Sequence, residues 1–282
     1  MSIALQVALV MVTILVVLLV IGAPIGVAIG MSSAVSMICM IPADVSFATS
    51  AQRIFAGSNS FSLIAIPFFI LAGNIMNNGG IATRLVNCAK VISGRMPGAL
   101  AQSNVVANML FGAISGSGAA AAAAMGGTIG PLEEKEGYDK NYSTAVNVAS
   151  APVGMLIPPS NTMIVYSSVA GSLSIAALFM AGYIPGLLWG GAVMILAGIM
   201  AKKRGYQAEQ RVPVKVALKT FWQAIPSLLL IVIVIGGILG GIFTATEGSA
   251  IAVVYATVLS LIYKAFKIKD IPRIVLEAAK TT

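Results

Sequence analysis

Two short stretches of this 282-residue chain carry polar groups where the surrounding sequence is apolar. One is Ser-Gly-Ser-Gly at 115–118, and the other is Pro-Pro-Ser-Asn at 158–161. Because proline has no N–H, the second stretch leaves backbone carbonyls free near 154–157, and Ser160 or Asn161 can cap a helix that restarts there. Carbonyls and serine hydroxyls suit a small hard cation, while free N–H groups at a helix start suit an anion. Both stretches are therefore candidate ion-binding sites.

The elements that must hold these stretches are a helical hairpin at 98–131 and a broken helix at 143–170. The half-helix 98–114 rises roughly 25 Å and 119–130 rises less than roughly 20 Å, so both fall short of a hydrocarbon core of roughly 30 Å. We therefore expect a re-entrant hairpin whose tip lies near the middle of the membrane. Two short spans with a packing face of small residues are the alternative for the hairpin, and a simple proline kink is the alternative for the broken helix.

The composition places the whole chain in a membrane. Hydrophobic residues make up 58% and charged residues 9%, which predicts an all-α polytopic membrane protein. The net charge of +8 comes from basic residues in loops beside apolar spans, which is a topology signal and argues against nucleic acid as a partner. The basic segments 79–96, 202–219 and 264–280 are expected in the cytoplasm, with the N-terminus outside.

Six further apolar runs predict membrane spans at 3–21, 24–41, 61–78, 174–201, 220–243 and 247–263. Two spans joined by a tight turn open the chain ("VIGAPIGVAIG"), and a similar pair recurs in the opposite orientation ("GIFTATEGSAIAVV"). This pattern is typical of the inverted repeats of secondary transporters. The expected organisation is scaffold spans and a cytoplasmic arm at 1–96, half of a transport domain at 97–171, a connecting span and basic loop at 172–219, and an incomplete second repeat at 220–282.

Titratable residues are scarce in the predicted spans. The chain has no His, so a Ser-His pair is excluded, and every Lys lies in a loop or tail, which argues against a Ser-Lys enzyme. Glu133, Glu134, Glu136 and Asp139 are expected in a solvated cytoplasmic loop, and Glu247 is expected to cap a helix start. Because the groups left at depth are hydroxyls and carbonyls, sodium is favoured over a proton as the coupled ion.

Several motifs in order resemble the large permease (M, DctM-like) subunit of tripartite ATP-independent periplasmic (TRAP) transporters: "NSFSLIAIPFFILAGNIMNNGGI", "SGSGAAAAAAMG", "APVGMLIPPSNTMIVYSSVAG", "ALFMAGYIPGLL" and "GIFTATEGSAIAVVYA". The resemblance implies an elevator-type transporter of the bacterial inner membrane, in contact with lipid. It implies sodium-driven uptake of a small carboxylate together with a small permease (Q) subunit and a soluble periplasmic substrate-binding protein (P). It also argues against a channel.

The resemblance implies site residues as well. Sodium is expected at the hydroxyls and carbonyls of Ser115, Ser117, Gly154, Ile157 and Pro159. The substrate carboxylate is expected beside that site, at Ser117, Gly118, Ser160 and Asn161. No cofactor is expected beyond sodium as the coupling ion.

The chain departs from the family pattern in one respect. Large permeases continue through a second hairpin and a second broken helix, and the resemblance implies that both are absent between residues 1 and 282. We therefore expect residues 1–282 alone not to transport. A truncated, non-transporting structural fragment is one alternative, and an ion-coupled carboxylate carrier of a related elevator family, independent of a binding protein, is another.

Overall fold

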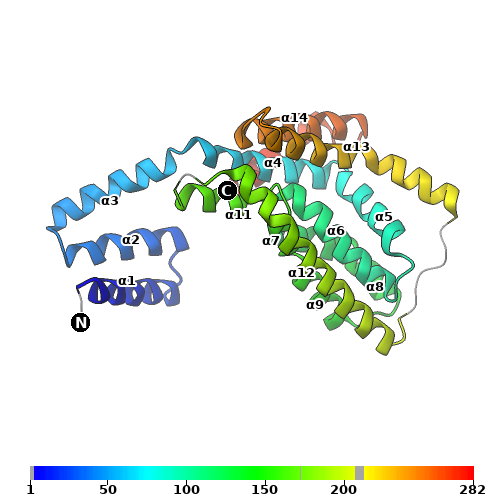
Figure 1. Ribbon diagram of the computed structural model, residues 1–282, viewed down its shortest axis with the longest axis horizontal. Coiled ribbons are helices and arrows are strands. Elements are labelled where there is room, and N and C mark those ends of the chain that lie inside the picture. Colours follow the sequence, from blue (N-terminus) through cyan, green and yellow to red (C-terminus); the bar gives the residue numbers. More distant parts are fainter. Residues whose placement is uncertain (1–2, 172, 207–212) are drawn as a thin grey trace. The chain divides into compact units, whose positions relative to one another are not determined.

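The computed structural model describes residues 3–171, 173–206 and 213–282, and every regular element within these ranges is a helix. The chain divides into two compact units, the first ending at Ser60 and the second beginning at Phe61 (Figure 1). The all-α class expected from the composition is therefore confirmed.

The first unit contains α1 (Ile3–Val20), α2 (Ile25–Ile38) and α3 (Ala43–Ser58), with α2 packed against the other two. Prolines precede α2 and α3 at their N-caps, where the missing N–H costs nothing. The span expected at 24–41 is shorter than predicted, because residues 39–41 form a turn and leave a helix of 14 residues, or about 21 Å.

The second unit contains the hairpin, the broken helix and the helices that pack around them. In chain order these are η1 (Phe61–Ile64), α4 (Ala65–Asn78), α5 (Ile81–Ser93), α6 (Ala99–Ser115), α7 (Gly118–Thr128), α8 (Gly130–Lys135), α9 (Lys140–Ser150), α10 (Val153–Leu156), α11 (Asn161–Val169), α12 (Ile175–Lys203), α13 (Val214–Leu239), α14 (Ala245–Ile262), η2 (Ile268–Asp270) and α15 (Ile271–Thr281).

Five of the described helical segments are long and apolar enough to cross a membrane: α1, η1 with α4, α12, α13 and α14. The broken helix, α9 and α10 followed by α11, bends by 50° and makes a sixth if it is one span. The helix α13 begins at Val214, six residues before the predicted span, so Lys215 and Lys219 lie on a helix and not in a loop. Part of the expected basic loop, residues 207–212, lies outside the described residues.

One hydrophobic core joins α4, α5, α13 and α14 and contains Phe69, Met76, Leu85 and Leu230. Small residues let α14 approach α4 closely, as small residues do between membrane helices (Ala72, Gly79, Ala252 and Ala256). At the edge of this core the guanidinium of Arg84 stacks over the ring of Tyr263, 3.4 Å from its centroid.

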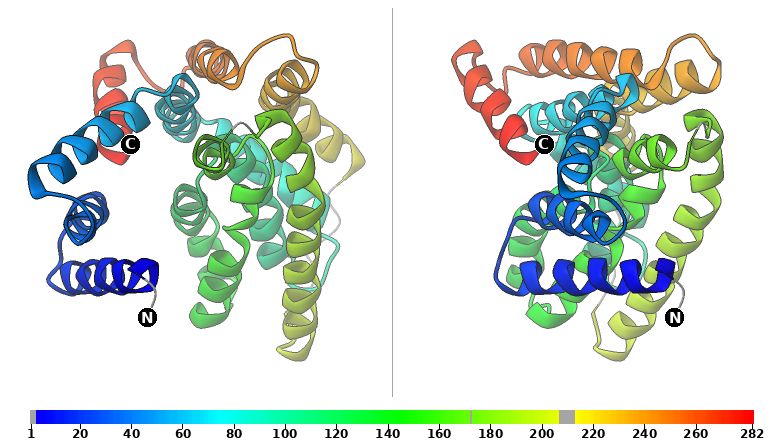
Figure 2. Two further views of the ribbon diagram at one scale, coloured as in Figure 1. Left: turned by 60° about the vertical axis from the view of Figure 1, so that its left-hand side comes forward. Right: turned by 90° about the vertical axis from the view of Figure 1, so that its left-hand side faces the viewer.

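A second core surrounds the hairpin. The helix α6 packs against α5, α9, α10 and α12, and it buries Val105 and Phe111 with Met125 of α7. Figure 2 shows α12 running beside the hairpin and α9. The arm at 79–96 forms the amphipathic α5, whose apolar side, including Cys88, is buried. Burial also raises the pKa of the Cys88 thiol.

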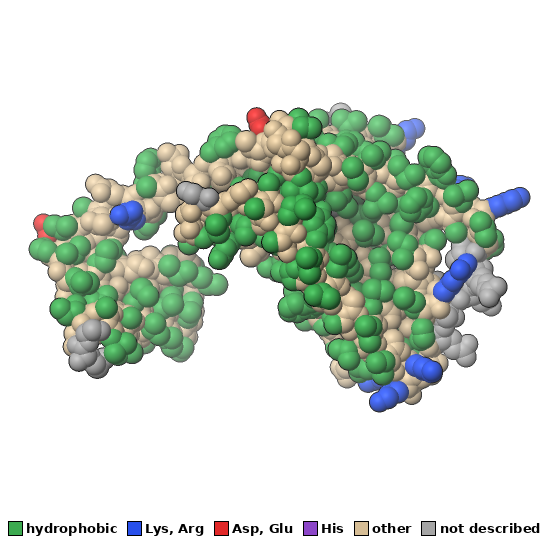
Figure 3. All heavy atoms as spheres, viewed as in Figure 1, with side chains coloured by type: hydrophobic (Ala, Val, Ile, Leu, Met, Phe, Trp, Pro, Cys, Tyr) green, Lys and Arg blue, Asp and Glu red, His purple; other side chains and the backbone are tan. Residues whose placement is uncertain are grey.

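The surface of the second unit is that of a membrane protein. Figure 3 shows hydrophobic side chains over most of its visible face, with Lys and Arg gathered where α12 ends and α13 begins. Lys202, Lys203 and Lys215 at these helix ends are all exposed. This distribution is the one that positive-inside topology predicts for spans entering the cytoplasm.

Candidate functional site

The hairpin begins and ends at the basic end of α12. Gly98, just before α6, packs against Ala201 near the end of α12. On the returning side, Asp139 forms an ion pair with Arg204 at 3.1 Å and donates its backbone N–H to the Tyr206 hydroxyl at 2.8 Å. Both arms of the hairpin are therefore held at the same end of a full-length span.

The depth of the hairpin can be measured along α12. Gly186 of α12 faces Ile157 in the broken helix, and Gly190 faces Met109 of the hairpin. From Ala201 to Gly186 the helix rises about 22 Å, and α12 continues about 16 Å beyond, to Ile175. The breaks lie beside the middle part of α12, which supports a re-entrant hairpin over two short spans.

Only Gly116 and Ser117 separate the two arms of the hairpin. Gly116 adopts φ +62°, in the left-handed region where a side chain is unfavourable. Ser117 is the N-cap of α7, and its Oγ accepts a hydrogen bond from the Ala120 N–H at 3.3 Å. The Ser115 hydroxyl is buried beside it, 3.4 Å from the Ser117 carbonyl oxygen.

The second break separates α10 from α11. Ser160 is the N-cap of α11, where its Oγ accepts from the Met163 N–H at 3.4 Å and donates to the Met155 carbonyl. Pro158 has no N–H to offer the carbonyl of Gly154, four residues earlier in the chain. The Gly154 carbonyl therefore lacks its usual helical donor, as expected, whereas the Met155 carbonyl accepts a hydrogen bond from the Ser160 hydroxyl.

The structure brings the two breaks together. Gly112 of α6 crosses Gly154 of α10 backbone to backbone, so closely that a Cβ on Gly112 would lie 2.5 Å from the Gly154 Cα. Beyond this crossing, Gly116 packs against Asn161, whose Nδ2 donates to the Ser115 carbonyl at 3.4 Å. The Asn161 Oδ1 is buried and has no hydrogen-bond partner among the described residues.

This arrangement offers neutral oxygens and helix ends. The segments 112–119 and 154–163 contain no charged side chain. The N-termini of α7 and α11, which carry partial positive charge, adjoin hydroxyls and the carbonyl end of α6. No group of three His, Cys, Asp or Glu side chains able to hold a metal occurs among the described residues. The chemistry available is weak, reversible binding of a hard cation or an anion.

A cavity of about 350 Å³ lies beside the hairpin tip. Ser115 and Ser117 line it together with Gly73, Asn74 and Asn77 of α4. The other predicted site residues do not line this cavity: Gly118, Gly154, Ile157, Pro159, Ser160 and Asn161. The α4 asparagines were missed because 61–78 reads as an ordinary span. Their signal is the polar run "NIMNN" at its end.

Two expectations about acidic residues have opposite outcomes. Glu247 does cap its helix, accepting from the Thr244 N–H at 2.7 Å in a capping box. The prediction of a solvated Glu133 is wrong, because only 1% of this residue is exposed, whereas Glu134 and Glu136 are exposed. The short helix α8 turns Glu133 inward, towards α6 and α9.

Known proteins are similar in sequence to this chain over most of its length. The family described as "Tripartite ATP-independent periplasmic transporter, DctM component" matches residues 12–282. The "Uncharacterized protein YgiK" of Salmonella typhimurium is 51% identical over 89% of this chain and 58% of its own length. The C4-dicarboxylate TRAP transporter large permease protein DctM of Rhodobacter capsulatus is 38% identical over 82% of this chain and 56% of its own length. The sialic acid TRAP transporter large permease protein SiaM of Vibrio cholerae is 38% identical over 83% of this chain and 55% of its own length.

The chain thus spans somewhat more than half the length of these curated relatives. The family consists of transporter permeases and not enzymes, and its members work with a small permease and a substrate-binding protein. Family and apolar helices together indicate a multi-pass protein of the bacterial inner membrane. The chain belongs to the DctM family, the large permease component of TRAP transporters.

Proposed function

We propose that this permease takes up a small organic anion bearing a carboxylate, driven by sodium and supplied by a periplasmic binding protein. The observation that carries the proposal is the meeting of two helix breaks without any charged side chain. Neutral oxygens favour a monovalent hard cation, and two helix N-termini beside them favour an anion. A cation and an anion bound side by side neutralise each other in a low-dielectric site, which couples their binding.

The proposed sodium site uses the hydroxyls of Ser115 and Ser117 with carbonyls of Gly154, Ile157 and Pro159. Burial of Ser115 and the absence of an N–H on Pro158, four residues after Gly154, support this ligand set. A cation there would compensate oxygen atoms that the helix breaks leave with too few donors.

The proposed carboxylate site lies next to it, at Ser117, Gly118, Ser160 and Asn161. Gly118 and Asn161 are the first residues of α7 and α11, so backbone N–H groups are available at both helix starts. The names of relatives support an organic anion, since they specify C4-dicarboxylate, sialic acid and isethionate. We further propose that the hairpin and broken helix move as a body in an elevator mechanism.

The test measures sodium dependence of uptake. The full permease, with its small permease and binding protein, is reconstituted in liposomes as wild type, Ser115→Ala or Ser117→Ala. Each substitution removes an oxygen ligand and should raise the sodium concentration for half-maximal uptake about tenfold. Ser168→Ala is the matched control, because Ser168 is an exposed serine of α11 whose hydroxyl bonds the Ile164 carbonyl at 3.0 Å and no other described residue.

Abundance and docking of the binding protein should change little in these variants. Uptake that persists in sodium-free buffer under a proton gradient would contradict sodium coupling. Uptake of equal rate without the binding protein would instead favour an independent carrier of a related elevator family.

A further inference from the structure

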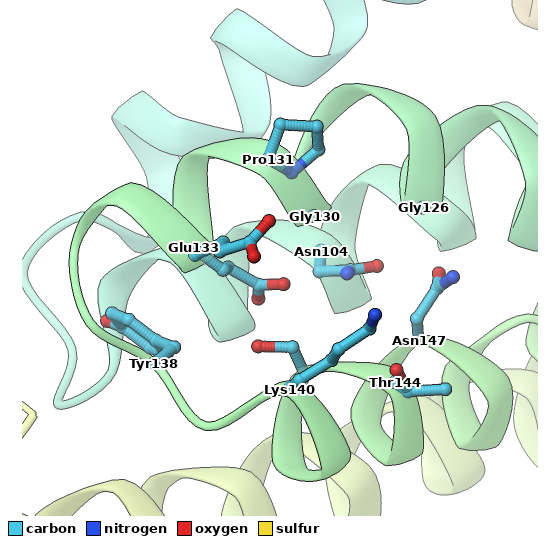
Figure 4. A pocket seen from close by; sticks show the side chains of 11 residues that line it. Asn104, Gly126, Gly130, Pro131, Glu133, Tyr138, Lys140, Thr144 and Asn147 are labelled. Atoms are coloured by element: carbon cyan, nitrogen blue, oxygen red, sulfur yellow. The ribbon is translucent and has the colours of Figure 1, made fainter.

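A second cavity of about 350 Å³ lies at the opposite end of the hairpin. We call it the hairpin-base cavity; α6, α7, α8 and α9 enclose it, and its walls include Asn104, Glu133, Glu134, Lys140, Ser143 and Asn147. Figure 4 shows Glu133, Asn104 and Lys140 directed into the same space from three different helices. From Asn104 to Ser115 at the tip, α6 rises about 16 Å, so the two sites are separate.

Buried polar atoms without partners face this cavity. Both carboxylate oxygens of Glu133, the Nδ2 of Asn104 and the Oγ of Ser143 have no hydrogen bond of ordinary length among the described residues, although Ser143 and Asn104 lie close enough to Glu133 to lower its pKa in part. The exposed fractions of these residues are 1%, 1% and 9%. Buried polar groups are normally paired, so four such atoms around one cavity make it a candidate site for a polar ligand.

The orientation of Asn104 is fixed by its neighbours. Its Oδ1 accepts a hydrogen bond from the Asn108 Nδ2 at 2.9 Å, and that amide also contacts the Asn147 Oδ1 at 2.9 Å. The Asn104 Nδ2 is left to face the cavity, where it can donate to the Glu133 carboxylate. A donor beside this carboxylate favours its charged form and leaves the other oxygen for a cation.

The charge of the cavity points to a positive occupant. Glu133 and Glu134 contribute two negative charges, and Lys140 of α9 contributes one positive charge. Burial raises the pKa of the Glu133 carboxyl, while Ser143 and Asn104 lower it in part. No ion pair joins Lys140 to Glu133 among the described residues. Lys140 therefore does not neutralise Glu133 by an ion pair, and a bound cation would compensate the charged form of this buried carboxyl.

We propose that the hairpin-base cavity is a second sodium site, in which Glu133 and Ser143 supply the protein oxygens and water completes the coordination. A single buried carboxylate matches a monovalent cation better than a divalent one, which usually takes several acidic ligands. The volume leaves room for the ion with some of its water. The proposal does not depend on the sodium site at the hairpin tip.

Two other positive occupants are possible in chemical terms, a proton on Glu133 or the ammonium of Lys140. Infrared difference spectra of the full permease in lipid nanodiscs, recorded with sodium minus choline, distinguish them. The expected result is loss of a protonated carboxyl band and gain of a carboxylate band on adding sodium. The change should be absent in Glu133→Gln and retained in Glu134→Gln, the exposed neighbour, and in the Ser115→Ala and Ser117→Ala double variant.

Two further variants keep the test decisive if Glu133→Gln folds poorly. Ser143→Ala should raise the sodium concentration for half of the spectral change about tenfold, since it removes one ligand oxygen. Lys140→Met should lower that concentration, because it removes a competing positive charge. A carboxyl band that does not respond to sodium, or a response abolished by Lys140→Met, would overturn the proposal in favour of the proton or of Lys140.

Discussion

The tip and the base of the hairpin differ in the kind of polar group that they contain, although α6 and α7 contribute to both. At the tip, glycines bring backbone against backbone, and the polar groups are carbonyls, N–H groups and hydroxyls. At the base, side chains dominate: Glu133 is buried beside Asn104, and Tyr138, Tyr142 and Tyr206 cluster, with Tyr138 and Tyr206 stacked at 4.3 Å between centroids. The tip carries no charged residue, whereas the base carries several.

The difference follows from depth in the membrane. A charged side chain near the middle of a bilayer is expensive, so a site there must be neutral when its ligands leave. Backbone dipoles can meet this requirement, since they bind ions without carrying net charge. The base lies at the basic end of α12, where the cost of a charge is smaller, and there a carboxylate is tolerated. The surroundings thus limit which polar groups each end of the hairpin can hold: neutral groups at the tip, near the middle of the membrane, and charged side chains at the base.

The largest expected effect comes from breaking the contact on which the tip depends. Gly112→Ala places a Cβ 2.5 Å from the Gly154 Cα, so the hairpin and the broken helix must separate. We expect a loss of stability of about 1–3 kcal/mol and abolished uptake. Thermal unfolding and uptake measure both. Gly127→Ala in α7 is the control, because its Cβ would meet nothing within 4 Å; equal behaviour of the two variants would show that the crossing is not critical.

A smaller effect should follow from giving the tip the character of the base. Asn161→Asp is nearly isosteric but adds a negative charge where we propose a carboxylate binds. Repulsion at low dielectric should raise the KM for an anionic substrate by about tenfold or more. The sodium concentration for half-maximal uptake should not rise, since a carboxylate attracts the cation. A raised sodium requirement with an unchanged KM would instead place the anion away from Asn161.

The smallest expected effect concerns the base and depends on pH. Because the folded state raises the pKa of Glu133, it binds the proton more tightly than the unfolded state does. Its contribution to stability is complete below the unfolded pKa and is lost as pH rises through the folded pKa. Glu134, Tyr138 and Lys140 line the same cavity, and the charge of Glu133 also acts on Tyr142.

Unfolding temperatures measured in choline buffer should therefore fall from acidic to neutral pH in the wild type, with a smaller fall in Glu133→Gln. Sodium should reduce the slope in the wild type only. An identical slope in both proteins would mean that Glu133 has the same pKa folded and unfolded.

Sequence patterns located the two helix breaks closely, but they did not show which residues pack around those breaks. Ser-Gly-Ser-Gly and Pro-Pro interrupt helices for local reasons, so the gaps between α6 and α7 and between α10 and α11 were predicted closely. The cavity wall from α4 was not predicted, because Asn74 and Asn77 meet the tip only through tertiary packing. Glu133 was misplaced for a related reason: four acidic residues in "EEKEGYDK" indicate a solvated loop, and nothing local shows which one turns inward.

The glycines of α12 have a mechanical consequence. Gly182, Gly186 and Gly190 recur every four residues on one face, and each lies against the broken helix or the hairpin: a methyl group on Gly182 would clash with the Leu156 carbonyl oxygen, and one on Gly186 or Gly190 would lie 2.7 Å from the side chain of Ile157 or Met109. Helix contacts packed this closely resist sliding, so a displacement of one helix is passed on to the other. These contacts favour movement of α12 together with the hairpin over sliding of the hairpin along α12. If the hairpin and the broken helix move as we propose, α12 is expected to move with them, and the relative displacement would fall on other contacts.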